Sequence, residues 1–138
     1  MGSPRLAKLC DSIELSVKDS CKGRISVSFS GGIDSTLIAF LAQKHCVVEL
    51  IAVGIPDAHD LEAARSASEL IDMELKVIEV EPKDMITEGM EMQKCLNLSS
   101  IEVEFMLPFW IAAKNSDNSI LMCGQGADEL FGGYARFR

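Results

Sequence analysis

The chain has 138 residues, of which 48% are hydrophobic and 25% charged, a composition typical of one globular domain, which we expect over residues 1–138. Its 13 basic and 21 acidic residues give a net charge of −8, which disfavours binding to nucleic-acid phosphates or to an anionic membrane. No apolar run reaches the roughly 18 to 20 residues that cross a bilayer, and the first residues lack the pattern of a signal peptide, so we expect a cytoplasmic protein.

Helical and extended patterns alternate along the chain. Residues 24–29 are β-branched and alternate in polarity, as strands do, whereas residues 61–71 place apolar side chains three and four positions apart, as helices do. In chain order, the sequence predicts a helix ending at Gly23, a strand over 24–29, a helix over 34–44, a strand over 47–54, a helix over 61–71, a strand over 75–80, helices over 82–96 and 103–114, a strand over 119–123 and a helix starting near Ala127. This alternation predicts a mostly parallel, twisted sheet inside a three-layer α/β sandwich.

The order of the expected strands brings two glycine-rich loops together. Right-handed crossovers send strands 2 and 3 to one side of strand 1 and bring strand 4 to the other side, which gives the order 3-2-1-4. The loops at residues 30–32 and 124–126 follow strands 1 and 4, so both should lie at the carboxyl edge of the sheet, where open sheets of this kind bind ligands. Strand 4 is then an edge strand, which is a reason to expect self-association, as in a homodimer, a partner subunit, or a missing carboxyl-terminal part.

The first of these loops has the chemistry of an anion site. Residues 30–36 (SGGIDST) offer consecutive backbone amides, hydroxyl groups and the start of a helix, a combination that binds phosphate. An ordinary strand-to-helix turn is the alternative for a lone glycine pair, but the complete string after a β-branched strand favours phosphate. The chain has no GxxxxGKS/T motif and no third glycine of a dinucleotide fingerprint after Gly126, which disfavours the kinase, GTPase and dehydrogenase classes.

Three motifs carry a family resemblance. The string SGGIDS at residues 30–35 resembles the SGGxDS signature of the PP-loop ATP pyrophosphatases, which cleave ATP between its α and β phosphates and adenylate a substrate. Residues 124–134 (GQGADELFGGY) are similar to the GEGSDExFGGY segment of the asparagine synthetase C-terminal domain. Residues 53–56 (VGIP) and 60–64 (DLEAA) are similar to the second-strand region of the same family. The resemblance covers residues 24–134, after an amino-terminal helix over 1–23, and implies an adenine nucleotide alpha hydrolase-like fold that uses ATP and Mg²⁺.

The resemblance also implies roles for individual residues. Those that match the family's nucleotide-binding positions are Phe29, Ser30, Gly31, Gly32, Asp34, Ser35, Thr36, Val53, Gly54, Cys123 and Gly124. Asp34 and Asp128 match its magnesium ligands, and with Glu129 they would place like charges beside a polyphosphate, which requires a cation such as Mg²⁺. Helix-start acids are the alternative for Asp128 and Glu129. The expected catalytic residues are Asp34, Gln125 and Asp128.

Departures from the family bear on the reaction. Gln125 stands where asparagine synthetases carry a glutamate associated with nitrogen transfer, and an amide has no proton to titrate. The sequence ends before the family's lysine against the α-phosphate, so positive charge for the transition state is expected from Arg136, Arg138 or a partner, or else is not supplied. Residue 2 is glycine rather than the cysteine of a glutaminase, so nitrogen is expected as free ammonia or from another subunit.

Three functions remain open at this point. The first, which we favour, is an AMP-forming carbon–nitrogen ligase of amino-acid biosynthesis that uses ATP, Mg²⁺ and a small carboxylic acid, with aspartate as a candidate. The second is a catalytically impaired ATP-binding module or a subunit of a larger complex, a hypothesis motivated by Gln125. The third is a PP-loop tRNA-modifying enzyme, which the net charge of −8 and the absence of a CxxC pair disfavour.

Two further sets of side chains carry weaker signals. The five cysteines are expected to be small buried side chains. The methionines and aromatic residues of 82–114 are interpreted either as an adaptable substrate or partner surface or as the packing of a core or a dimer.

Overall fold

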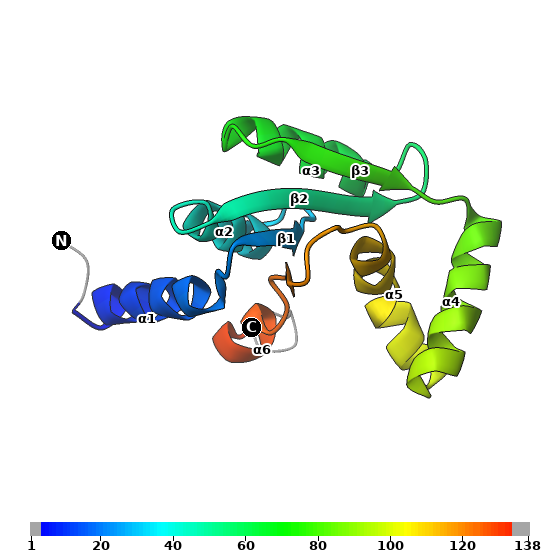
Figure 1. The fold of residues 1–138 in the computed structure, drawn as a ribbon. Coiled ribbons are helices and arrows are strands. Elements are labelled where there is room, and N and C mark those ends of the chain that lie inside the picture. The colour runs from blue at the N-terminus through cyan, green and yellow to red at the C-terminus, as the bar shows by residue number, and fades with distance from the viewer. Residues whose placement is uncertain (1–3, 134–138) are drawn as a thin grey trace.

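The computed structural model describes residues 4–133 and contains the expected helices and strands in the expected order (Figure 1). They are α1 (Pro4–Ser20), β1 (Arg24–Ser28), α2 (Ile33–Ala42), β2 (Val47–Gly54), α3 (His59–Leu70), β3 (Leu75–Glu79), α4 (Pro82–Leu96), α5 (Ser100–Lys114), β4 (Leu121–Met122) and α6 (Ala127–Phe131). The bounds of β2 are those predicted, because glycine and proline mark the end of this strand in the sequence.

The four strands form one parallel sheet in the order β3-β2-β1-β4, which confirms the predicted topology. On one face of the sheet, Ile25 and Val27 of β1 are fully buried against Val17 of α1, Ala39 of α2 and Ala64 of α3. Helix α5 packs against β1 and β2, and α4 packs against α5. Figure 1 shows that the α4–α5 hairpin lies beside the carboxyl ends of the strands. The hairpin therefore stands at the edge of the sheet where the sequence predicts the site.

Most elements agree with the prediction to within two residues, but the start of α5 and the length of β4 differ more. Helix α5 begins at Ser100 rather than at residue 103, because Ser99 and Glu102 form a capping box: the Ser99 hydroxyl accepts from the Glu102 N–H, and the Glu102 carboxylate accepts from the Ser99 N–H at 2.8 Å. The Ser99 hydroxyl and N–H hold the pKa of Glu102 below its usual range. Strand β4 has only two residues, and after it the chain approaches the start of α2 at Gly124.

The cysteine prediction is wrong for three positions. Cys10, Cys95 and Cys123 are exposed, and Cys21 and Cys46 are partly buried. Burial, and a hydrogen bond with Cys21, raise the pKa of Cys46 to about 12, so this thiol stays protonated at neutral pH.

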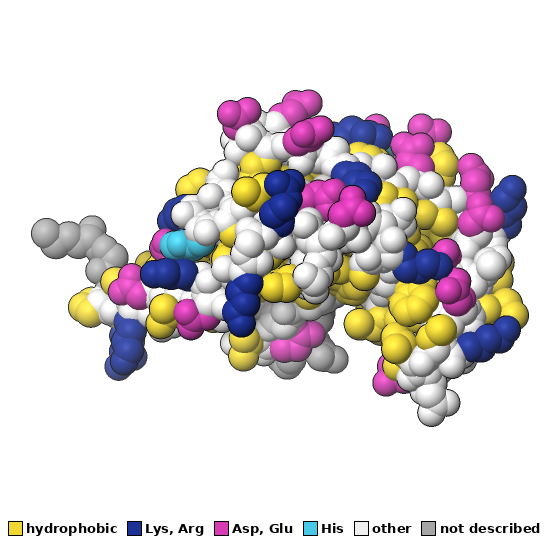
Figure 2. All heavy atoms as spheres, viewed as in Figure 1, with side chains coloured by type: hydrophobic (Ala, Val, Ile, Leu, Met, Phe, Trp, Pro, Cys, Tyr) yellow, Lys and Arg dark blue, Asp and Glu magenta, His cyan; other side chains and the backbone are white. Residues whose placement is uncertain are grey.

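The methionines of the α4–α5 hairpin divide between the core and the surface. Met92 is buried, whereas Met90, Met106 and Phe105 are exposed. Figure 2 shows hydrophobic side chains over this hairpin, and on the same face of the molecule the Lys and Arg side chains are interspersed with Asp and Glu. Among the described helices, none alone has the length and apolar composition to cross a membrane; α4 and α5 have them only when joined, and they are bent by 107° at their junction.

A polar contact joins the two helices of the hairpin. Glu88 of α4 accepts hydrogen bonds from the Trp110 indole and the Lys114 ammonium of α5, each at 2.9 Å. Lys114 also contacts Glu91 at 2.9 Å. The hydrogen bond from Lys114, followed by that from Trp110, holds the pKa of Glu88 below its ordinary value of 4.5. Because the folded protein favours the ionised carboxylate, this contact stabilises the fold above about pH 4.5 and is lost as the pH falls through the lowered pKa.

We expect Glu88→Gln to lower the free energy of unfolding by roughly 1 kcal/mol at pH 7, because the amide loses a charge-assisted hydrogen bond. The difference from the wild type should shrink between pH 7 and pH 3, as the pH falls through the lowered pKa of Glu88 and its carboxylate loses the charge that the amide lacks. Denaturant titrations at the two pH values measure it. Glu104→Gln, a change at an exposed position of α5, serves as the control and should have no effect at either pH. An undiminished difference at pH 3 would contradict the assignment.

Candidate functional site

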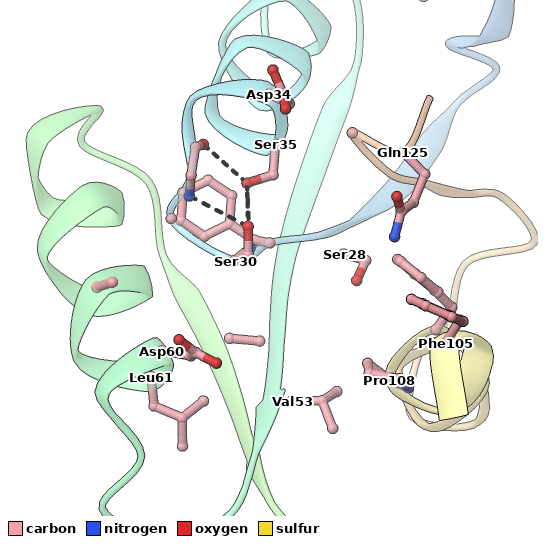
Figure 3. Close-up of a pocket in the computed structure, with 17 residues that line it drawn as sticks. Ser28, Ser30, Asp34, Ser35, Val53, Asp60, Leu61, Phe105, Pro108 and Gln125 are labelled. Carbon is pink, nitrogen blue, oxygen red and sulfur yellow. Dashed lines mark hydrogen bonds between the residues drawn. The ribbon is translucent and has the colours of Figure 1, made fainter. Parts of the chain in front are cut away.

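A cavity of about 590 Å³ lies at the carboxyl ends of β1 and β2 (Figure 3). Its walls come from both glycine loops, from α3 and from α5. The sequence-predicted residues that line it are Phe29, Ser30, Gly31, Gly32, Asp34, Ser35, Val53, Gly124 and Gln125. Its volume falls within the range of small-molecule and cofactor sites.

The first loop is closed by its own hydroxyl groups. The Ser35 hydroxyl accepts from the Ser30 N–H at 3.3 Å, donates to the Gly32 carbonyl at 3.2 Å and lies 3.1 Å from the Ser30 hydroxyl (Figure 3). The Ser30 hydroxyl in turn accepts from the Gly32 N–H at 3.3 Å. Because Ser35 is only 4% exposed, its hydroxyl holds the loop together rather than facing solvent. No side chain caps the start of α2, which leaves the amides of its first turn open to an anion.

Two glycines allow the backbone to approach closely at this site. Gly31 has φ +77°, and a Cβ on it would lie 2.5 Å from the Ala63 carbonyl oxygen of α3. A Cβ on Gly124 would lie 2.8 Å from both the Cβ of Asp34 and the backbone nitrogen of Ser35. Real Cβ atoms do not come this close, so the contact between the two loops requires glycine at residue 124. The loops therefore meet at the sheet edge, as their positions in the sequence predict.

Five predicted site residues do not line the cavity. The Thr36 N–H donates to the Gly32 carbonyl in the first turn of α2, Gly54 packs against the Leu61 side chain, and Cys123 is exposed. Asp128 and Glu129 begin α6, where a Cβ at Gly133 would collide with the Asp128 carboxylate.

The three expected metal ligands, Asp34, Asp128 and Glu129, do not form a metal-binding cluster. Within residues 4–133, no three His, Cys, Asp or Glu side chains are placed to hold one ion. The described residues do not include Tyr134, which ends the second motif. They also do not include Arg136 and Arg138, the expected source of positive charge. The metal and catalytic assignments therefore stay predictions.

Residues outside the predicted site complete the cavity, among them Phe105 and Phe109, which belong to the aromatic set that the sequence left open as a substrate or partner surface or as packing. Phe105, Pro108 and Phe109 of α5 form an apolar wall that lies across the cavity from Asp60 and from Leu61 of α3 (Figure 3). Ser28, Ala52 and Ala63 add small side chains. The proline inside an apolar helix was the available signal for the wall, but helix periodicity alone does not say which side of the sheet a helix faces.

The charged side chains that line the cavity are acidic. Asp34 and Asp60 line it, and among the described residues no lysine or arginine does. Two carboxylates repel an anionic ligand unless a cation lies between them and the ligand. The cavity thus combines backbone amides that can bind an anion, carboxylates that suit a hard divalent cation, and an apolar wall.

Sequence comparison gives one family over nearly the whole chain. The sequence model described as asparagine synthase matches residues 8–138. "Putative asparagine synthetase (glutamine-hydrolyzing) 1" of Methanocaldococcus jannaschii is 32% identical over 117 residues, which are 82% of this chain and 22% of the relative. "Asparagine synthetase domain-containing protein CG17486" of Drosophila melanogaster is 26% identical over 154 residues, with 91% and 27% covered. The chain thus spans about a quarter of the length of these relatives.

Solved structures share the fold at lower identity. The ammonia-dependent NAD synthetase of Campylobacter jejuni superposes with a TM-score of 0.57 at 23% identity, covering 93% of this chain and 58% of that one. The NMN synthetase of Francisella tularensis gives 0.57 at 19% identity, covering 99% and 61%. Both have the PP-loop, adenine nucleotide alpha hydrolase-like fold. With the family's sequence model matched over residues 8–138 and this fold around the SGGIDS loop, the chain belongs to the asparagine synthase family of the PP-loop ATP pyrophosphatase superfamily.

Proposed function

We propose that this chain binds ATP with Mg²⁺ in the cavity and activates a carboxylic acid as its adenylate. The observation that carries the proposal is the contact of Gly124 with Asp34 and Ser35, which joins the two family motifs in one cavity. A lone glycine pair would be an ordinary strand-to-helix turn. Two motifs that meet at the carboxyl edge of a parallel sheet are typical of a nucleotide site.

In the proposed site, the phosphates of ATP lie against backbone amides of the first loop. The hydroxyls of Ser30 and Ser35 close the loop and accept from the N–H groups of Gly32 and Ser30, so the amides of Gly31 and of the first turn of α2 are the proposed phosphate donors. Asp34, which lines the cavity, would hold Mg²⁺. Asp128 does not line the cavity in the described structure, so its role as a second ligand stays a prediction from the family resemblance. When bound, Mg²⁺ neutralises the charge of the phosphates beside these carboxylates. Magnesium sites of this kind need one or two carboxylates plus phosphates, so the proposal does not require a cluster of three acidic side chains.

The nucleoside end of the proposed site is apolar. Phe29 is 2% exposed and is both part of the core and the floor of the cavity, with Val53 beside it. Phe105 and Pro108 close the opposite side. These side chains offer a base and ribose apolar contact, while backbone groups at the strand ends supply hydrogen bonds.

In the proposed reaction, a carboxylate oxygen of the acid attacks the α-phosphorus of ATP, the bond to the bridging oxygen of the β-phosphate breaks, and pyrophosphate leaves. Aspartate is the first acid to test, because the named relatives are asparagine synthetases. The Gln125 amide lines the cavity and donates or accepts hydrogen bonds, but it takes up no proton at neutral pH. The proposal therefore ends at the adenylate, and the nitrogen for any later step comes from ammonia or another subunit.

The test is the exchange of labelled pyrophosphate into ATP, with a panel of carboxylic acids that includes aspartate. We expect exchange that depends on Mg²⁺ and on one acid, and we expect Asp34→Ala to abolish it. Asp19→Ala, which removes an exposed carboxylate at the end of α1, is the control and should leave the rate unchanged. Exchange that persists undiminished in Asp34→Ala would contradict the site assignment.

A second candidate function is an ATP-binding module without catalysis. Gln125 and the absence of a basic side chain among the described cavity residues favour it. This alternative predicts that calorimetry detects Mg-ATP binding while no acid supports exchange. In that case the chain would act as a subunit of a larger complex.

A further inference from the structure

Polar side chains cross the middle of the sheet, where a parallel sheet covered by helices is usually apolar. They are Ser26 of β1, Glu49 of β2, Lys76 of β3, and Ser116 and Asn118 of the connection between α5 and β4, and we name them the polar strap. Ser26 is fully buried. The other members are partly exposed, with side-chain exposures of 28% for Glu49 and 43% for Lys76. A fully buried hydroxyl with three polar partners calls for an explanation beyond stability, because an apolar side chain would fill the same space at lower desolvation cost.

The Ser26 hydroxyl is the centre of the strap. It donates to Glu49 Oε2 at 2.8 Å, accepts from Asn118 Nδ2 at 2.9 Å and lies 2.6 Å from the Ser116 hydroxyl. Asn118 Nδ2 also lies 3.4 Å from Glu49 Oε2. A hydroxyl has one donor and two acceptor positions, so Ser26 has a partner for each. The hydroxyl therefore fixes residues 116–118 against β1 and β2 in a single arrangement.

Lys76 connects the strap to β3. Lys76 Nζ lies 3.8 Å from Glu49 Oε1 and donates to the Asn115 carbonyl at the end of α5. The connection that enters β4 is thereby tied to β1, β2 and β3 at once.

Strand β4 needs such an anchor because its own pairing is minimal. Only Leu121 and Met122 pair with β1, and the Ser26 N–H donates to the Ile120 carbonyl at 2.9 Å. Yet this strand sets the position of Gly124, where only glycine fits against Asp34. A slip of one residue would place the side chain of a neighbouring residue in that contact.

We propose that the strap fixes the register of β4 and thereby positions Gly124 and Gln125 at the cavity, with Ser26 and Asn118 as positioning residues. The effect on nucleotide binding rests on the function proposed above, whereas the effect on the loop does not. The two are therefore measured separately.

Hydrogen exchange with mass spectrometry measures the loop directly. In Ser26→Ala and in Asn118→Ala, we expect amide exchange in residues 119–126 to rise about tenfold, the equivalent of one lost buried hydrogen bond. Residues 50–53 of β2 should keep their wild-type exchange. Glu49→Gln keeps an acceptor oxygen for both donors and should stay within about twofold of the wild type. Arg65→Ala, which breaks the 3.2 Å ion pair between α3 and β3, is the matched control and should leave residues 119–126 unchanged.

Mg-ATP affinity, measured by calorimetry, should fall about tenfold in Asn118→Ala and stay unchanged in Arg65→Ala. A uniform rise of exchange across the whole chain, or no rise in residues 119–126, would overturn the strap proposal. If the wild type binds no Mg-ATP, the proposed function fails, and the exchange pattern still decides the role of the strap.

Discussion

Replacing Gly31 by alanine is expected to cost roughly 2 to 4 kcal/mol of folding free energy and to weaken Mg-ATP binding about 100-fold. Residue 31 has φ +77°, which strains an L-residue, and the new Cβ would meet the Ala63 carbonyl at 2.5 Å. Backbone cannot rotate away as a side chain can, so the loop must move away from α3 by about 1 Å. Under the proposed function, such a shift removes about two charge-assisted hydrogen bonds from amides to phosphate.

Gly23 offers a matched control for this experiment. It has the same φ of +77°, but a Cβ there would meet no atom within 4 Å. Gly23→Ala should therefore cost about 1 kcal/mol from backbone strain alone and leave Mg-ATP affinity unchanged. Denaturant titration and calorimetry on both variants separate the two contributions. Equal losses of stability in Gly23→Ala and Gly31→Ala would show that the loop does not pack against α3 as described.

The second large effect is expected for Gly124→Ala. The added Cβ would push the second loop away from Asp34 and Ser35, both of which it would approach to 2.8 Å. We expect a stability loss of about 1 to 3 kcal/mol from overpacking and a fall in Mg-ATP affinity of at least about tenfold, because the two motifs can no longer share one cavity. Thermal unfolding and calorimetry give the two numbers.

Gly126→Ala in the same loop is the comparison. Residue 126 has φ +93°, so alanine is strained there, but nothing lies within 4 Å of its Cβ position. This variant should lose about 1 kcal/mol of stability and keep its nucleotide affinity. Wild-type affinity in Gly124→Ala would refute the convergence of the two loops, on which the proposed function depends.

The fold could be predicted from the sequence because its signals are local. The alternating strand over 24–29 and the glycine break after it define β1 and the loop without reference to the rest of the chain. Right-handed crossover then leaves few strand orders, and the predicted order 3-2-1-4 is the one observed. The errors are also local: the start of α5 depended on a capping box at Ser99, which the periodicity of the apolar residues does not report.

The cavity was predicted only in part. Its lining by Phe29 and by the loop at residues 30–35, which we propose as the anion site, follows from the motif, whereas Phe105 and Asp60 enter it through the packing of α5 and α3. Helical periodicity identifies an apolar face but not the cavity beside which that face will lie. The placement of Thr36, Cys123 and Asp128 away from the cavity lining likewise depends on where each backbone segment turns.

What the sequence determined by itself is the chemistry of the first loop, the parallel α/β topology and the family, because each depends on residue types at short, fixed spacings. Only the tertiary structure decided that Gly124 touches Asp34, that an apolar helix wall closes the cavity, and that the buried Ser26 hydroxyl is the centre of the polar strap. These features join residues that are far apart along the chain. Such contacts are set by the packing and register of whole elements, and no local pattern encodes them.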